Sequence, residues 1–225
     1  MSAIERRLAA EFAGSLILAG TVIGSGVLAS RLAAGNDAVA LIGNTVATAA
    51  ILYVLITALG PISGAHFNPA VTLAMALRRE IAPAPAALYA LTQIAGCVAG
   101  ALLAHAMFEL PLLQLGAQER SGVAQALSEA VATFALIAAI LLVSRFRPDA
   151  TAAAVALTIA AGYWWTASTS FANPAITIAR ALSNTFAGIR PEDAPMFIAA
   201  QFAGALVALA VCVWLAPPDT GRAQR

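Results

Sequence analysis

The residues that could do chemistry lie in a stretch that occurs twice. Residues 63–77 read SGAHFNPAVTLAMAL and residues 168–182 read STSFANPAITIARAL, and they agree at eight of fifteen positions without gaps. The agreement is densest at two triplets, Asn68-Pro69-Ala70 and Asn173-Pro174-Ala175. Their chemistry is hydrogen bonding, because an Asn side chain carries both an acceptor oxygen and amide donors.

Each triplet predicts the start of a short helix. Asn is a strong N-cap, and Pro suits the first helical turn, where its missing N–H is not needed. From Asn68 to Arg78 is about ten residues, or about 15 Å, which is half of a hydrocarbon core about 30 Å thick. If each helix enters a membrane from its own side, the two N-termini meet near the midplane.

At that meeting point we expect a binding site for polar molecules. Each Asn oxygen can accept from the early N–H groups of its own helix. The amide donors of Asn68 and Asn173 then point into the lumen, the open space between the two helix ends. The non-helical segments 63–67 and 169–172 must be buried in protein or line a watery cavity, so their carbonyls form a ladder of acceptors. Both helices also point their positive ends at the same spot, which repels cations and protons.

Two carboxylates recur at matching places, Glu11 and, 118 residues later, Glu129. A carboxylate inside a membrane span is expensive and usually faces the protein interior. We expect each to accept hydrogen bonds from the backbone of one Asn-Pro-Ala loop. The alternative is a proton relay in a coupled carrier. His66 lies beside the first Asn. It is predicted to line the cytoplasmic half of the watery cavity.

No residue pattern predicts catalysis or a cofactor. Ser168 and Ser170 have no histidine near them in the sequence, so the chain does not read as an enzyme. With only 2 His and 2 Cys, and neither His near a Cys, the sequence predicts no metal site.

The elements that must position these residues are membrane spans. The chain has 225 residues, of which 61% are hydrophobic and 10% charged, and its mean hydropathy is +0.86. These values indicate a single-domain membrane protein, residues 1–225, and a net charge of +1 gives no sign of a nucleic-acid partner. Six apolar runs are predicted to span, at 8–30, 38–59, 86–108, 123–144, 150–168 and 196–216.

The spans group into two copies, about 8–108 and about 123–216, each with three spans and one half-helix. An odd number of spans inverts the second copy relative to the first. Eight arginines fall on one side, at positions 6, 7, 78, 79, 145, 147, 222 and 225, against four on the other, at positions 31, 120, 180 and 190. By the positive-inside rule both termini are cytoplasmic.

The paired triplets on inverted half-helices, the two Glu residues and the segment SGAHFNPAVT resemble the major intrinsic protein family of aquaporins and aquaglyceroporins. The resemblance implies an all-α fold of six transmembrane helices and two re-entrant half-helices. It also implies a homotetramer in the cell membrane, with one pore per subunit for water and small neutral solutes.

The chain departs from this family at the selectivity filter. The family's usual Arg, three residues after the second Asn, is replaced by Ile176. Gapless counting from the Asn residues assigns the other filter positions to Thr48, Ala161 and Ser170, and a gap of one or two residues would substitute Gly162 or Tyr163. Such a filter is wider and lacks its fixed cation. The departure resembles the bacterial aquaglyceroporins associated with arsenic handling, which suggests arsenous acid as the solute, with glycerol as the generic candidate.

Arg180 lies one turn beyond Ile176 on the same face, about 6 Å further toward the outer mouth. We expect it to lend a positive potential to an outer vestibule while leaving the constriction free. The alternatives are that it neutralises the end of the half-helix, binds Glu192 or Asp193, or reaches lipid head groups.

Two other classes of membrane protein share parts of this pattern. A secondary carrier also uses inverted repeats and broken helices, but it accumulates its solute by ion coupling. A junctional protein of the same fold would conduct little.

Overall fold

The computed structural model describes residues 2–217, and the ordered elements within that range are helices. Six long helices are α1 (Ala3–Leu32), α2 (Asp37–Ser63), α4 (Pro83–Met107), α5 (Val123–Phe146), α6 (Thr151–Trp165) and α8 (Ala194–Leu215). Two short helices are α3 (Pro69–Leu77) and α7 (Pro174–Ala181), and a 3-10 turn η1 (Pro148–Ala150) precedes α6. Arg222 and Arg225 lie outside the described residues.

The six expected spans are all present as helices. Five of them, α1, α2, α4, α5 and α8, are long and apolar enough to cross a membrane. The sixth, α6, has only 15 residues, because it ends at Trp165, three residues before the end of the expected span, and the backbone becomes extended at Thr166. The predicted all-α membrane fold is confirmed.

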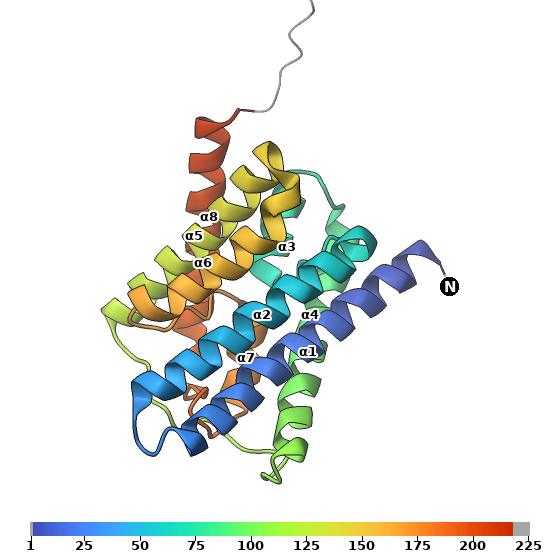
Figure 1. Ribbon diagram of the computed structural model, residues 1–225. Coiled ribbons are helices and arrows are strands. Elements are labelled where there is room, and N and C mark those ends of the chain that lie inside the picture. The colour runs from blue at the N-terminus through green and yellow to red at the C-terminus, as the bar shows by residue number, and fades with distance from the viewer. Residues whose placement is uncertain (1, 218–225) are drawn as a thin grey trace, which may run out of the picture.

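The helices form a bundle around the two short ones. The contacts place α1 against α2, α2 against α6 and α6 against α5, and Figure 1 shows these four side by side. Within each copy the first and last helices pair, α1 with α4 and α5 with α8. Each half-helix also packs on the other copy, α3 against α8 and α7 against α4. The half-helices are therefore held by long helices of both copies.

Glycines let the paired helices approach closely. A Cβ on Gly204 of α8 would lie 2.1 Å from the carbonyl oxygen of Ala130, and one on its counterpart Gly96 of α4 would lie 2.6 Å from that of Phe12. The obstructing atoms are backbone, which cannot rotate away. A residue with a side chain at either position therefore forces the helices apart.

We expect Gly204→Ala to destabilise the protein by about 1–3 kcal/mol, the usual cost of overpacking. The control is Gly20→Ala on α1, whose Cβ would meet Gly100 oxygen at 3.4 Å, an ordinary contact. Alanine favours a helix over glycine by about 1 kcal/mol, so this control should be neutral or stabilising. Thermal unfolding in detergent compares the two, and a melting temperature for Gly204→Ala at or above that of Gly20→Ala would contradict the prediction.

Candidate functional site

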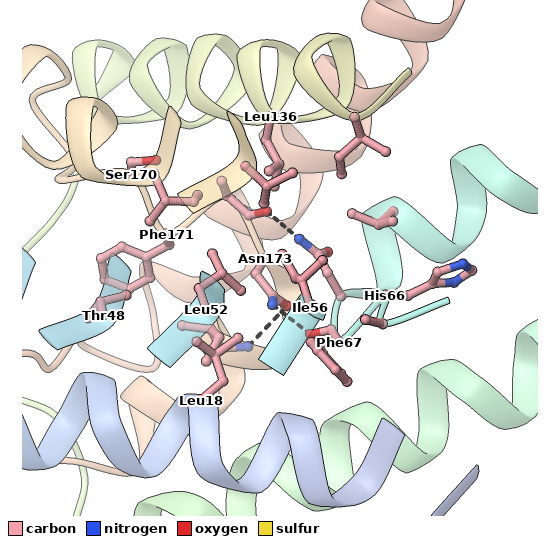
Figure 2. A pocket seen from close by; sticks show the side chains of 18 of the residues that line it. Leu18, Thr48, Leu52, Ile56, His66, Phe67, Leu136, Ser170, Phe171 and Asn173 are labelled. Atoms are coloured by element: carbon pink, nitrogen blue, oxygen red, sulfur yellow. Dashed lines mark hydrogen bonds between the residues drawn. The ribbon is translucent and has the colours of Figure 1, made fainter. Parts of the chain in front are cut away.

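A cavity of about 280 Å³ follows the line where the two loops meet. Figure 2 shows its length: His66 lies at one end, Asn173 near the middle, and Thr48, Ser170 and Phe171 at the other end. Most of the wall is apolar side chain from the long helices and half-helices, namely Leu18, Val22, Leu52, Ile56, Val71, Met75, Leu136, Ile140, Val155, Ile159 and Ile176. Polar groups along the cavity come from the two loops and from helix side chains, among them Thr48, Tyr163 and Arg180.

The two Asn side chains cap their half-helices. Asn68 Oδ1 accepts from the N–H of Ala70 at 2.8 Å, and Asn173 Oδ1 accepts from those of Ala175 at 2.9 Å and Ile176 at 3.3 Å. Both Asn side chains line the cavity. Pro69 and Pro174 occupy the first helical positions, where no N–H is required.

The amide nitrogens are engaged more fully than the sequence predicts. Asn68 Nδ2 donates to the carbonyl of Ala172 at 2.7 Å, and Asn173 Nδ2 donates to that of Phe67 at 2.8 Å. Each Asn thus ties its half-helix to the loop of the other copy, as the dashed lines in Figure 2 show. An amide carries two hydrogens, so one remains on each Asn for a molecule in the cavity.

Glu11 holds the first loop from within α1. Its two oxygens accept from the N–H groups of His66 at 3.0 Å and Phe67 at 2.8 Å. The hydroxyl of Ser63 and the amide of Gln93 donate to it as well, at 2.6 and 2.8 Å. With four donors around it, this carboxylate is fully occupied as a loop anchor.

Glu129 holds the second loop in the same manner. It accepts from the N–H groups of Phe171 at 2.8 Å and Ala172 at 2.9 Å, and from the amide of Gln201 at 2.6 Å. Both Glu residues are 0% exposed. The contacts are those expected of a loop anchor, and neither Glu lines the cavity, where a proton relay would need it.

His66 lines the cavity at the end away from Ser170. Its Nδ1 lies 3.1 Å from the hydroxyl of Thr72, and its ring meets that of Tyr89 edge-on, with centroids 5.4 Å apart. The second copy repeats this aromatic pair as Phe171 and Phe197, 5.0 Å apart. Phe171 is thus the counterpart of His66, a signal in the aligned repeats that sequence reasoning missed.

The four residues that counting assigned to the filter do not all line the cavity. Thr48, Ser170 and Ile176 line the cavity, but Ala161 lies on the exposed side of α6 and does not. Tyr163 takes its place, with its hydroxyl 3.3 Å from that of Thr48. The gapless count is wrong because it made the connection between α6 and the second Asn two residues too long. Gly162 packs directly on Ser170, with no room for a Cβ.

Arg180 lies in the wall of the cavity and not in an open vestibule. Its side chain is 2% exposed, its Nε donates to the carbonyl of Ala187, and its Cζ lies 3.3 Å from the centre of the Phe171 ring. Asp193, a partner considered for it, binds Arg190 at 3.1 Å instead. A reach to lipid head groups is likewise excluded by the burial of Arg180.

A second arginine, which sequence reasoning did not single out, approaches the same ring. Arg120 comes from the connection between α4 and α5, and its Cζ lies 5.1 Å from the centre of Phe171. It donates to the carbonyls of Gly188 at 2.9 Å and Ser168 at 3.3 Å. Burial lowers the pKa of this guanidinium. Two guanidinium groups therefore approach the Phe171 ring, one from half-helix α7 and one from the connection between α4 and α5.

Comparison with known proteins gives consistent matches. The profile of the family described as Major intrinsic protein matches residues 1–145. The chain is 52% identical to Aquaglyceroporin AqpS of Rhizobium meliloti over 215 residues, covering 96% of this chain and 92% of that protein. It is 39% identical to the Lens fiber major intrinsic protein of Gallus gallus over 100 residues, covering 44% of this chain and 36% of that one.

Among solved structures, the aquaglyceroporin from Plasmodium falciparum superposes with a TM-score of 0.71 over 95% of this chain and 98% of that one. Sequence identity in that superposition is 17%, so the similarity is evidence for the fold alone. The fold extends over both copies of the repeat, including the second half-helix that the family profile does not reach.

Proposed function

Since the chain belongs to the major intrinsic protein family, and is thus a multi-pass membrane channel for small solutes and not an enzyme, we propose that it conducts neutral solutes larger than water. Glycerol is the generic substrate in this proposal, and some water passes as well. The observation that carries it is Ile176, an uncharged side chain in the cavity wall where the family usually has Arg.

The reason is size and hydrogen bonding at the constriction. Thr48, Ser170 and Tyr163 offer three hydroxyl groups there, while Ile176 offers an apolar surface. A solute with several hydroxyl groups can replace its lost water contacts on these side chains and then on the two Asn amides. Because position 176 carries no guanidinium, the donors that surround the solute there are hydroxyl groups, whose hydrogens rotate to suit it.

Arsenous acid is the second solute that we propose for the same pore. Like glycerol it carries three hydroxyl groups, is uncharged at neutral pH and is compact. The same hydroxyl and apolar groups that would bind glycerol can bind arsenous acid, so the proposal needs no additional site. Uptake of both solutes into one preparation of proteoliposomes would rank them.

We expect Ile176→Arg to lower glycerol permeability about fivefold while water permeability falls less. The reason is that a guanidinium at this position narrows the pore and adds a positive charge to its wall. Ile176→Val, which copies the counterpart Val71 of the first copy, is the matched control and should keep glycerol permeability. Stopped-flow light scattering on proteoliposomes measures both solutes. Equal glycerol permeability in the Arg and Val variants would contradict the proposed role of Ile176, and absence of glycerol flux in the unmodified protein would contradict the function itself.

The same assay separates the rival classes. A channel lets glycerol equilibrate at a rate that does not change when a pH gradient is imposed, whereas a proton-coupled carrier would accumulate it. A junctional protein would leave the vesicles as tight as lipid alone. Glu11 and Glu129 both accept hydrogen bonds from the loop backbone. Because these contacts occupy the carboxylates that a proton-coupled carrier would use, they favour the channel.

For orientation and assembly we propose both termini in the cytoplasm of the cell and four subunits side by side in its membrane. The arginine distribution supports the orientation. Large apolar side chains on the outside of α2, including Val39, Ile42, Val46 and Val54, are exposed in the single chain. They supply surface for lipid or for neighbouring subunits.

A further inference from the structure

We propose that Arg180 forms a binding site for small oxyacid anions in the outer half of the pore. The proposal rests on the proposed function only in that solutes reach Arg180 through a conducting pore. It differs from a general vestibule charge because it assigns a particular group, the two terminal nitrogens of one guanidinium, and a particular ligand chemistry.

The terminal nitrogens of Arg180 are available. Its Nε is used on Ala187, and one face of the guanidinium is covered by Phe171. No residue from 2 to 217 accepts a hydrogen bond from either terminal nitrogen, and neither is among the buried atoms that lack a partner. Arg180 lines the cavity and is 2% exposed. We infer that the terminal nitrogens are the part of its side chain that meets the open space.

Arg180 has no ion-pair partner within the described part of the chain, and the negative charge of Glu129 acts on it only from beyond contact distance. Of the acids at this end, Asp193 binds Arg190 and the N–H of Arg120, and Glu129 is taken by the loop backbone. Arg120 adds a second positive charge beside the same Phe171 ring. A buried cation without a partner favours the arrival of an anion, since attraction is strong where water is scarce.

The shape of the guanidinium selects the anion. Its planar fork matches two oxygens on one atom, as in a carboxylate, sulfonate or phosphonate, and binds them with two parallel hydrogen bonds. The counterpart of Arg180 in the first copy is Met75, which lines the opposite end of the cavity without any hydrogen-bond donor. The site therefore exists at the outer end alone.

The test is competition with glycerol flux in proteoliposomes. Methanesulfonate is the probe, because it is a compact anion at any working pH, does not cross lipid readily and offers oxygens on one sulfur. Gluconate at the same ionic strength is the reference anion, too large for the cavity, and dimethyl sulfone is the uncharged analogue. With each compound on both sides of the membrane, we expect methanesulfonate to lower glycerol permeability about twofold or more relative to the other two.

Three variants test whether the inhibition by methanesulfonate depends on Arg180. Arg180→Met copies the first copy of the repeat and should remove the inhibition; Arg180→Lys keeps the charge without the fork and should weaken it. Arg31→Met is the matched control, since Arg31 is exposed and lies outside the cavity, and inhibition should persist in it. For each variant, glycerol permeability in methanesulfonate is divided by its permeability in gluconate. A substitution that alters permeability in both solutions therefore leaves this ratio unchanged.

The outcomes are distinct. If methanesulfonate and gluconate give equal glycerol permeability in the unmodified protein, or if inhibition survives in Arg180→Met, the site does not exist. If Arg180→Met does not fold, the weakened inhibition in Arg180→Lys decides, and full inhibition there refutes the bidentate site. A lack of glycerol flux in gluconate would refute the proposed function and not this site.

Discussion

Glu129→Gln is expected to lower glycerol permeability about tenfold or more and to reduce thermal stability. The carboxylate accepts from two loop N–H groups and from Gln201 with no exposure to solvent. An amide replaces one acceptor oxygen with a donor, which leaves at least one N–H of the loop without a partner. A buried unsatisfied donor costs about 1–3 kcal/mol, and more where the lost partner was charged. The second loop, which lines the half of the cavity that contains Ser170, would shift. Stopped-flow permeability and thermal unfolding measure the two effects.

The matched control makes the same chemical change on the surface. Glu109 is exposed and lies outside the cavity, so Glu109→Gln should match the unmodified protein in both measurements. Glu11→Gln should resemble Glu129→Gln, because Glu11 holds the first loop with equivalent contacts. Normal permeability and melting temperature in Glu129→Gln would show that the loop does not depend on the charge, and the anchor interpretation would be wrong.

The features that the sequence predicts well are those fixed by local chemistry repeated twice. The Asn-Pro pairs start helices at residues 69 and 174 as expected, because capping depends on the residues next to it. Glu11 and Glu129 contact the loops as expected, since an isolated carboxylate in a span has few other uses. The two-copy pattern strengthens both predictions, as each copy must satisfy the same contacts.

The features that the sequence does not predict depend on distances across the fold. The position of Tyr163 beside Thr48 follows from a connection two residues shorter than gapless counting assumes. The contact of Arg180 with Phe171 requires the side chain to turn inward and not toward the outer surface. The bond from Asn68 to Ala172 joins residues 104 positions apart. None of these has a signature in neighbouring residues.

These long-range contacts make the centre of the pore a single unit. Phe67 receives the bond from Asn173 on its carbonyl while its own N–H donates to Glu11, and Ala172 has the same two roles for Asn68 and Glu129. A chain of hydrogen bonds thus runs from α1 through both loops to α5. Displacing one loop must disturb the other, which predicts coupling between substitutions in the two copies.

Asn173→Ala is expected to lower glycerol permeability about tenfold or more for that reason. The substitution removes the cap of α7, the bond to Phe67 and the remaining amide hydrogen in the cavity. Loss of the cap alone costs about 0.5–2 kcal/mol. Asn36→Ala is the matched control, because Asn36 caps α2 with the same two-bond geometry outside the cavity. It should melt at a lower temperature yet conduct normally.

The double variant Asn68→Ala with Asn173→Ala tests whether the two side chains act together. If each Asn only capped its own helix, the losses of stability would add within about 0.5 kcal/mol. Because each donates to the loop that carries the other, the second substitution should cost less than the first, since the contact it would break is already displaced. Thermal unfolding of the four proteins gives the coupling energy. Strict additivity would mean that the two half-helices meet without depending on each other, and that the cavity between them is held open by the long helices alone.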